Sequence, residues 1–228
     1  MKVKFGMFIT DGVGSVGGHT IQKNHYGLFA RTKVVPANPQ TTPQQDRRAQ
    51  LQFLTQNWRA LTLMEQTAWN DETVNYPRTN SLGDTYFMTG QTLYIGLNMN
   101  LWRIGESFIT LPVNKVIPPS FDAFVVDCNV RGTVFTLSEF SPVTDGDTKF
   151  IVYASIGLSP GKFYVSTKLR SIASHDLDGS GTYNFDSDYW TYFPSTVAGT
   201  KVFVKVLTIH ARCGCAGLPV FADCIVDP

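Results

Sequence analysis

Apolar and polar side chains alternate along the first 37 residues, and this pattern predicts extended chain rather than helix. The runs "KVKFGMF" and "TIQKNHYGLFARTKVV" each alternate with a period near two, and the glycine-rich stretch "TDGVGSVGG" separates them as a flexible loop. Such a segment buries little apolar surface by itself. We therefore expect residues 1–37 to form an extended or β-strand leader arm that needs a partner surface, in its own chain or in a neighbour.

The pattern becomes helical after residue 38. Thr42 is expected to be the N-cap residue, Pro43 to occupy the first helical position, and Gln45 to complete a capping box. Apolar residues then recur at spacings of three and four, which places them on one face of a helix that ends near its last member. This stripe consists of Leu51, Leu54, Trp58 and Leu61.

Two further helices are expected directly after the first. Thr62 and Glu65 have the spacing of a second capping box, so a new helix starts at once and carries Trp69. The segment "TYFMTGQTLYIGLNMNLWRIG" again spaces apolar residues by three and four and ends at Gly105, where a helix can stop. Residues 38–110 are thus predicted to be a three-helix assembly module.

Beyond Pro118 the period changes to two. Short β-branched and aromatic runs such as "FDAFVVDC", "TKFIVYAS" and "TKVFVKVLTI" alternate with turn-rich spacers, and this indicates an antiparallel sandwich of immunoglobulin or fibronectin type III kind over residues 118–228. The expected fold class is α+β: an extended or β leader and a small helical module, followed by an antiparallel β-sandwich.

Composition points to an assembly component. With 43% hydrophobic residues the chain can fill a real core, whereas 16% charged residues is low for a soluble domain, which favours a surface covered by neighbours. Residues 1–60 hold eight Lys and Arg against Asp11 and Asp46. This low density of positive charge is compatible with binding to the acidic face of a neighbouring subunit. It is too low for us to expect nucleic acid as a partner.

The sequence predicts neither a membrane span nor an export signal. It contains no run of 18 apolar residues, and the apolar patch near its start is short and interrupted by glycine. Four cysteines are too few for a disulfide scaffold of this length, so reduced thiols are the expectation in a chain made in the cytoplasm.

Two segments offer incomplete metal-site patterns. Asp176, Asp178 and Ser180 match the front half of a calcium loop, but Ser187 stands where a bidentate glutamate is needed, which favours an exposed turn. The segment "HARCGCAGLPVFADC" supplies four zinc-ligand types in an unusual C-x-C spacing, which favours a hairpin with incidental thiols over zinc or a disulfide. Its candidate ligands are His210, Cys213, Cys215 and Cys224, of which Cys224 also fits the inward period of its run with Val220, Ala222 and Val226.

Catalytic patterns are scarce. Gly12, Gly14 and Gly17 form G-x-G-x-x-G, but a strand-like segment follows where a dinucleotide site needs a helix. There is no G-x-S-x-G, H-E-x-x-H or P-loop motif, and the four histidines lack acidic partners at a telling spacing. We expect a protein without catalytic residues, bound cofactor or metal.

The run "HYGLFARTKVVPANPQTTPQQDRRAQLQFLTQNWRALTLMEQTAWN" resembles the leader of a group of uncharacterised bacteriophage and prophage proteins. That group joins an N-P-x-T-x-x-Q-x-x-x-R motif to a helix ending in W-x-x-L-T, and its third helix is similar to "TGQTLYIGLNMNLWRIG". The matching positions of the leader motif are Arg31, Asn38, Pro39, Thr41, Gln44, Arg48, Trp58, Leu61, Thr62 and Trp69.

This resemblance implies a structural component of a bacteriophage virion: a capsid-associated, decoration or head–tail connecting protein that acts through subunit interfaces. Its partners would be other virion proteins, as a homo-oligomer or bound to capsid or tail subunits. The alternative is a surface carbohydrate-binding or adhesion module whose loops "DLDGSG" and "DYWTYF" contact glycan. The interface candidates are Phe5, Phe8, Ile21, Tyr26, Phe29, Arg31, Trp58 and Trp69.

Overall fold

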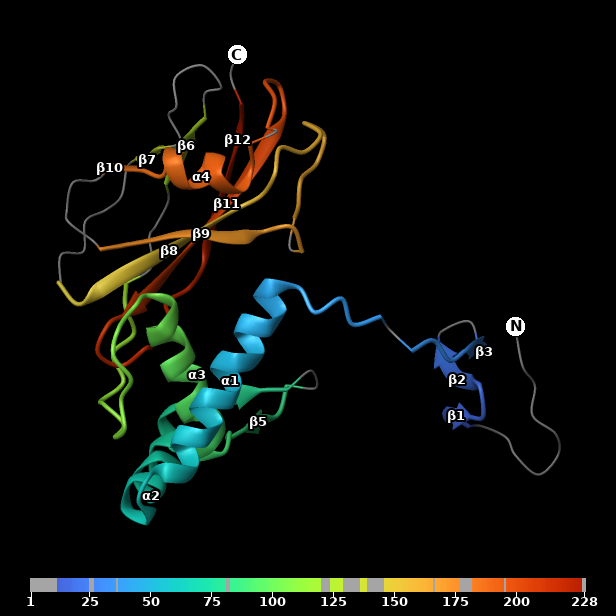
Figure 1. Cartoon of the computed structure of the whole chain (residues 1–228), viewed down its shortest axis with the longest axis vertical. Coiled ribbons are helices and arrows are strands. Elements are labelled where there is room, and N and C mark those ends of the chain that lie inside the picture. The colour runs from blue at the N-terminus through green and yellow to red at the C-terminus, as the bar shows by residue number, and fades with distance from the viewer. Residues whose placement is uncertain are drawn as a thin grey trace. The chain divides into compact units, whose positions relative to one another are not determined.

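The computed structural model describes residues 12–24, 27–35, 37–80, 83–119, 124–128, 136–138, 146–165, 167–176, 182–194 and 196–226. Within these ranges the protein is a mixed α+β structure of four α-helices and antiparallel sheets (Figure 1). The chain divides into two compact units, residues 1–46 and residues 47–228, and each is described by itself.

The first unit contains a three-stranded antiparallel meander of short strands: β1 (Gly14–Val16), β2 (His19–Asn24) and β3 (Gly27–Thr32). Part of the expected glycine loop is therefore a strand. The reason is Gly17, whose φ of 57° lets Gly17 and Gly18 connect β1 to β2 as a two-residue hairpin turn. None of the described side chains in residues 12–46 is buried.

Helix α1 (Thr42–Ala60) links the two units. The backbone N–H groups of Gln44 and Gln45 both donate to the carbonyl of Thr41, so the helix begins with Thr41 as its N-cap residue, one position before the predicted cap. The apolar stripe is covered unevenly. Leu54 is buried and Trp58 is half-buried, but Leu51 is 48% exposed.

The second capping box is confirmed at the start of α2 (Leu63–Glu72). The Thr62 N–H donates to Glu65 Oε2 at 2.7 Å, and the Glu65 N–H donates to Thr62 Oγ1 at 3.3 Å. The Thr62 hydroxyl also donates to Glu65 Oε2 at 2.8 Å, and this hydrogen bond, together with the one from the Thr62 N–H, lowers the pKa of Glu65. A 3₁₀ turn, η1 (Thr73–Asn75), and a two-stranded ladder of β4 (Arg78–Thr79) and β5 (Thr85–Tyr86) lead on to the third helix.

The third helix is confirmed as α3 (Gly90–Arg103), but the predicted segment was too long at its start, because Thr85 and Tyr86 form β5. The Thr89 hydroxyl caps α3 by accepting from the Thr92 N–H at 3.3 Å. Its first residue must be glycine, because an added Cβ would collide with Asn70 of α2. Trp69 anchors the helices: its ring meets Tyr94 edge-on at 5.4 Å, and its Nε1–H donates to the Thr110 carbonyl at 2.7 Å.

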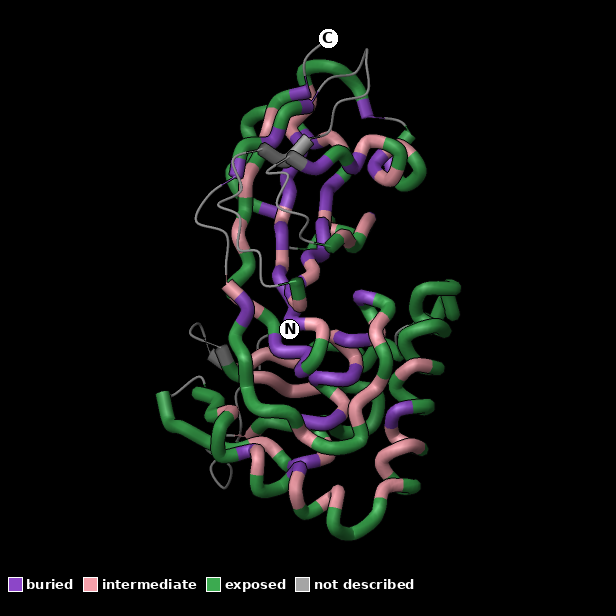
Figure 2. The backbone as a smooth tube through the Cα atoms, turned by 90° about the vertical axis from the view of Figure 1, so that its left-hand side faces the viewer, coloured by how far each residue is buried: buried purple, intermediate pink, exposed green. Residues whose placement is uncertain are grey.

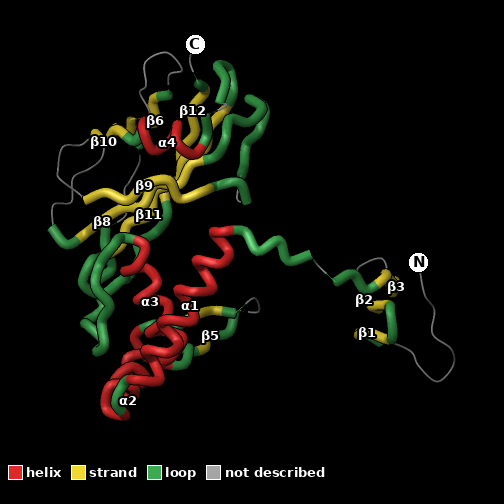
Figure 3. Tube along the Cα trace, in the orientation of Figure 1, coloured by secondary structure: helices red, strands yellow, loops and turns green. Residues whose placement is uncertain are grey.

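In the described residues of the C-terminal part, seven antiparallel strands form two sheets; strands are yellow in Figure 3. One sheet has the order β10-β7-β6 and the other the order β12-β11-β8-β9, and side chains from both sheets and from α4 (Asp186–Tyr192) share one apolar core. The first sheet comprises β6 (Val125–Asp127), β7 (Thr136–Ser138) and β10 (Thr182–Asn184); the second comprises β8 (Thr148–Ala154), β9 (Arg170–Asp176), β11 (Lys201–His210) and β12 (Val220–Ile225).

A disulfide joins Cys128, directly after β6, to Cys224 in β12, and so links the two sheets across a sequence separation of 96 residues. The expectation of four reduced cysteines is therefore wrong for this pair. Cys224 packs against the shared core together with Val220 and Ala222, as its inward period in the sequence predicted. Its sulfur meets that of Cys128 because the edges of the two sheets lie together there.

The helices and the strands of residues 47–228 belong to one compact unit, and Figure 2 marks buried positions in both. Leu101 and Ile104 at the end of α3 form one buried cluster with Ile151 of β8 and Ile209 of β11. Cys213 and Cys215, which follow β11, are buried with Trp69 and other helical residues. The end of β11 is therefore held against the helices, and the candidate site lies there.

Candidate functional site

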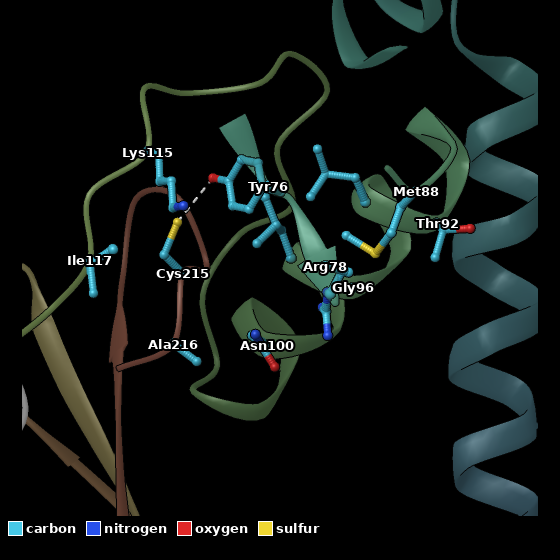
Figure 4. Close-up of a pocket in the computed structure, with 12 residues that line it drawn as sticks. Tyr76, Arg78, Met88, Thr92, Gly96, Asn100, Lys115, Ile117, Cys215 and Ala216 are labelled. Atoms are coloured by element: carbon cyan, nitrogen blue, oxygen red, sulfur yellow. Dashed lines mark hydrogen bonds between the residues drawn. The ribbon is translucent and has the colours of Figure 1, made fainter. Parts of the chain in front are cut away.

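A pocket of about 520 Å³ opens beside α3, where segments distant in the sequence meet (Figure 4). One wall is the helix itself, and the others come from the start of β4, the connector after α3 and the loop between β11 and β12. Among the described residues, the lining combines apolar groups with two cations and contains no carboxylate. Its principal side chains are Met88, Leu93, Leu97, Arg78, Lys115, Tyr76 and Cys215.

The loop after β11 is fixed tightly on α3 by Gly214. This residue has a φ of 69°, and an added Cβ would collide with the Leu97 carbonyl, so only glycine fits. Its carbonyl accepts from Asn100 Nδ2 at 2.9 Å, and its N–H donates to the His210 carbonyl at 2.9 Å. The C-G-C sequence thereby places two thiols at the edge of the pocket.

Both thiols of this loop are free and buried: Cys213 is 0% exposed and Cys215 is 4% exposed. Each has polar neighbours. The Tyr76 hydroxyl lies 3.2 Å from Cys215 Sγ, and Cys213 Sγ lies 3.4 Å from His210 Nδ1 and 3.4 Å from the Val116 carbonyl oxygen. Cys215 lines the pocket, whereas Cys213 lies behind it and does not.

The two thiols influence each other's protonation. A hydrogen bond from the Cys215 thiol lowers the pKa of Cys213, and the same contact, with burial, raises the pKa of Cys215. Burial, reinforced by the hydrogen bond to Cys215, likewise raises the pKa of Tyr76. The pair therefore loses its first proton at Cys213 and resists losing a second, while Tyr76 remains a neutral hydroxyl.

Positive charge lies at the pocket without a matching carboxylate. The Lys115 ammonium donates to the Asn75 carbonyl at 2.8 Å and lies 4.8 Å from the centre of the Tyr76 ring. Arg78 is exposed. In the described part of the chain, neither cation forms an ion pair with an acidic side chain. Both can therefore attract an anion to the pocket.

The structure disperses the interface candidates of the sequence. Ile21 and Phe29 are half-buried and Arg31 is exposed in the leader meander, while Phe5, Phe8 and Tyr26 lie outside the described residues. Trp58 is half-buried and its ring centre lies 5.5 Å from that of Tyr94. Trp69 is fully buried and belongs to the interior of its unit rather than to its surface.

The candidate zinc ligands do not assemble. Cys224 is bound in the disulfide, and only His210, Cys213 and Cys215 lie near one another. Across the described ranges, no group of three or more His, Cys, Asp or Glu side chains is arranged to hold a metal ion. For the calcium pattern, Asp176 forms an ion pair with Lys149 at 3.1 Å, and Asp178 and Ser180 lie outside the described residues.

The aromatic run "DYWTYF" is not the exposed loop that the carbohydrate alternative requires. It falls largely in α4, where Tyr189 is fully buried and Phe193 belongs to the shared core. The Tyr189 hydroxyl lies 3.0 Å from Thr196 Oγ1, and burial raises its pKa to about 12. Trp190 is half-buried and donates its Nε1–H to Asp186. These rings stabilise the core rather than form a stacking platform.

Comparison with known proteins gave no match to a family model, to a curated protein or to a solved structure. No helix in the described residues is both long and apolar enough to cross a membrane. The sequence pattern did not predict the pocket, because Tyr76, Lys115 and Cys215 come from separate segments with no fixed spacing. The C-G-C motif was the one visible signal for it.

Proposed function

We propose that this chain is a structural component of a bacteriophage virion that acts through subunit interfaces, with residues 1–46 as its assembly arm. The observation that carries the proposal is the meander without a core: among its described residues no side chain is buried. Three strands of three to six residues gain little stability alone, so the arm gains its stability from another surface.

The kind of contact follows from the strands themselves. A short antiparallel meander can extend the sheet of a neighbouring subunit, since backbone hydrogen bonds supply affinity and alternate side chains supply specificity. Ile21, paired with Ala30 on one face of the meander, and Phe29, paired with Gln22 on the other, are half-buried apolar groups that a neighbour would cover, and the exposed Arg31 is available to an acidic side chain.

We further propose that β6 to β12 form a sandwich of the immunoglobulin or fibronectin type III kind. The chain passes from β6 and β7 in one sheet to β8 and β9 in the other, returns to place β10 beside β7, and then crosses again to place β11 beside β8. This succession is typical of Greek-key sandwiches. The compact unit of residues 47–228 would then be the part that projects or decorates.

Removal of the arm tests the assembly role. Deleting residues 1–37 should leave a folded protein with unchanged circular dichroism, because the compact unit begins at Arg47. The deletion variant should be absent from purified particles when these are separated into heads and tails and analysed by mass spectrometry.

A matched pair of full-length variants refines this test. Phe29→Ser should reduce incorporation, whereas Val13→Ser, at a position that is already 70% exposed, should not. A deletion variant that entered particles at the normal level would contradict the proposal.

A further inference from the structure

We infer that Cys213 and Cys215 form a thiol–disulfide exchange site that reacts with an anionic low-molecular-weight disulfide bound in the pocket beside α3. The inference is independent of the assembly role. It rests on four features of the described residues: a pair of free thiols one residue apart, a pocket that reaches one of them, unpaired positive charge in that pocket, and polar groups that can move a proton.

Proximity is the first requirement. Only Gly214 separates the two cysteines, and its left-handed backbone turns the chain between the two buried thiols. Since Gly214 is held against α3, this arrangement is built into the fold and does not depend on a mobile loop. A bond between the two sulfur atoms therefore needs only a small local movement.

Access distinguishes the two sulfur atoms. Cys215 lines the pocket and is the point at which a small molecule can approach, while Cys213 is fully covered behind it. Cys215 is accordingly the attacking sulfur and Cys213 the resolving one. The negative charge can reach Cys215 because transfer of its proton along the hydrogen bond to Cys213 moves the charge between the two sulfur atoms.

The exchange proceeds in two balanced steps. The Cys215 thiolate attacks one sulfur of the bound disulfide R–S–S–R, so that a Cys215–S–S–R bond forms and R–S⁻ leaves. Cys213, as thiolate, then attacks the Cys215 sulfur, the Cys213–Cys215 bond forms, and the second R–S⁻ leaves. Because the pair starts singly deprotonated, its one remaining thiol proton ends on one released thiol and the other product leaves as R–S⁻. His210 Nδ1, 3.4 Å from Cys213 Sγ, can accept that proton in passage. The protein dithiol is oxidised and the small disulfide is reduced.

The pocket lining sets the charge of the disulfide. Arg78 and Lys115 present positive charge, and none of the described residues that line the pocket carries a carboxylate. Met88, Leu93 and Leu97 supply an apolar wall for the body of the molecule. A disulfide with carboxylate groups, such as oxidised glutathione, fits this lining, whereas the diamine disulfide cystamine places positive charge against two cations.

The test uses the full-length protein and oxidised glutathione as the probe. Intact mass spectrometry should show the loss of two hydrogen atoms, and digestion should give a peptide in which Cys213 and Cys215 are joined. Cys213→Ser should stop at a glutathione adduct on Cys215, because the resolving sulfur is missing. Cys215→Ser should form no adduct. The Cys128–Cys224 disulfide, present throughout, is the internal control.

Reaction rates with different disulfides test whether the pocket selects an anionic one. The paired substitution Arg78→Gln and Lys115→Gln should slow the reaction with oxidised glutathione about tenfold at low salt, and leave the reaction with uncharged hydroxyethyl disulfide unchanged. Circular dichroism verifies that each variant is folded, and Cys215→Ala replaces any serine variant that is not. Absence of the Cys213–Cys215 bond in the wild-type protein would overturn the inference. Equal rates for oxidised glutathione and cystamine would overturn the assignment of an anionic ligand.

Discussion

The two pairs of cysteines in residues 47–228 differ in how far apart their members lie in the sequence. Cys128 and Cys224 are 96 residues apart in sequence and join two sheets, whereas Cys213 and Cys215 are separated by one residue in a single loop. A cross-link that closes a loop of about a hundred residues restricts the unfolded chain by about 4 to 5 kcal/mol, while one that closes three residues restricts it very little. The first pair is therefore suited to stability and the second is available for chemistry.

Their surroundings differ in the same sense. Cys128 and Cys224 pack into the apolar core that both sheets share. Cys213 and Cys215 belong to a second apolar cluster, with Trp69, but their sulfur atoms also contact an imidazole, a phenol and a backbone carbonyl beside a pocket. Free thiols retained in such polar surroundings are those whose protonation and reactivity the structure can control. The comparison indicates that cysteine number alone says little, and that position relative to core and pocket decides the role.

The largest expected effect comes from removing the structural pair. The double substitution Cys128→Ala and Cys224→Ala should lower the free energy of unfolding by about 4 kcal/mol, because the unfolded chain regains the freedom of a long loop. Urea unfolding followed by circular dichroism measures the change. Reduced wild-type protein is the control, since it loses the same cross-link without a change of side chain. A double variant as stable as the oxidised wild type would show that the Cys128–Cys224 bond does not stabilise the fold.

A smaller loss is expected at the loop that holds the reactive pair. Gly214→Ala should lower the free energy of unfolding by about 2 to 3 kcal/mol, because alanine at a φ of 69° is strained and its Cβ meets the Leu97 carbonyl. Gly161→Ala is the matched control, since an added Cβ there meets nothing within 4 Å and the backbone is not left-handed. Equal stability of the two variants would show that the loop is not fixed as described.

The smallest expected effect concerns pH. An ordinary thiol, with a pKa of about 8.5, gains thiolate nearly a hundredfold between pH 6 and pH 8. The lowered pKa of Cys213 keeps the pair singly deprotonated further toward acid, so the rate with oxidised glutathione should rise less than about threefold over this range. Stopped-flow measurements at fixed ionic strength check the slope. A rate that rises with pH as steeply as that of an ordinary thiol would show that the structure does not control the protonation of Cys213 and Cys215.

Local patterns predicted much of the helical part. The capping box of Thr62 and Glu65 and the end of the third helix at Gly105 are governed by residues within a turn of one another, so the sequence contains the whole cause. The run "DYWTYF" is the contrary case. Its aromatic residues suit a strand or an exposed loop equally well, and the buried position of Tyr189 in a helix depends on a core formed by distant strands.

The cysteines show the same limit. The inward period of β12 predicted that Cys224 faces the core, but its bond depends on β6, which lies about a hundred residues earlier. The C-G-C motif was visible, but neither Tyr76 nor Lys115 has a spacing that connects it to Cys215. Contacts between distant segments are set by the packing of whole elements, and a single sequence does not display them.

Asn98 and Trp69 together determine where the chain can accept an insertion. Asn98, fully buried, donates to the carbonyls of Tyr94 and Ile109 and accepts from the Ile109 N–H at 2.8 Å, while Trp69 holds the next residue through the Thr110 carbonyl. These two side chains thus fix the length of the segment between the end of α3 and residue 110. We expect insertions to be excluded between residues 104 and 110 and tolerated in the largely exposed stretch 111–114, before the pocket residues begin at Lys115, so variation among related proteins should accumulate there.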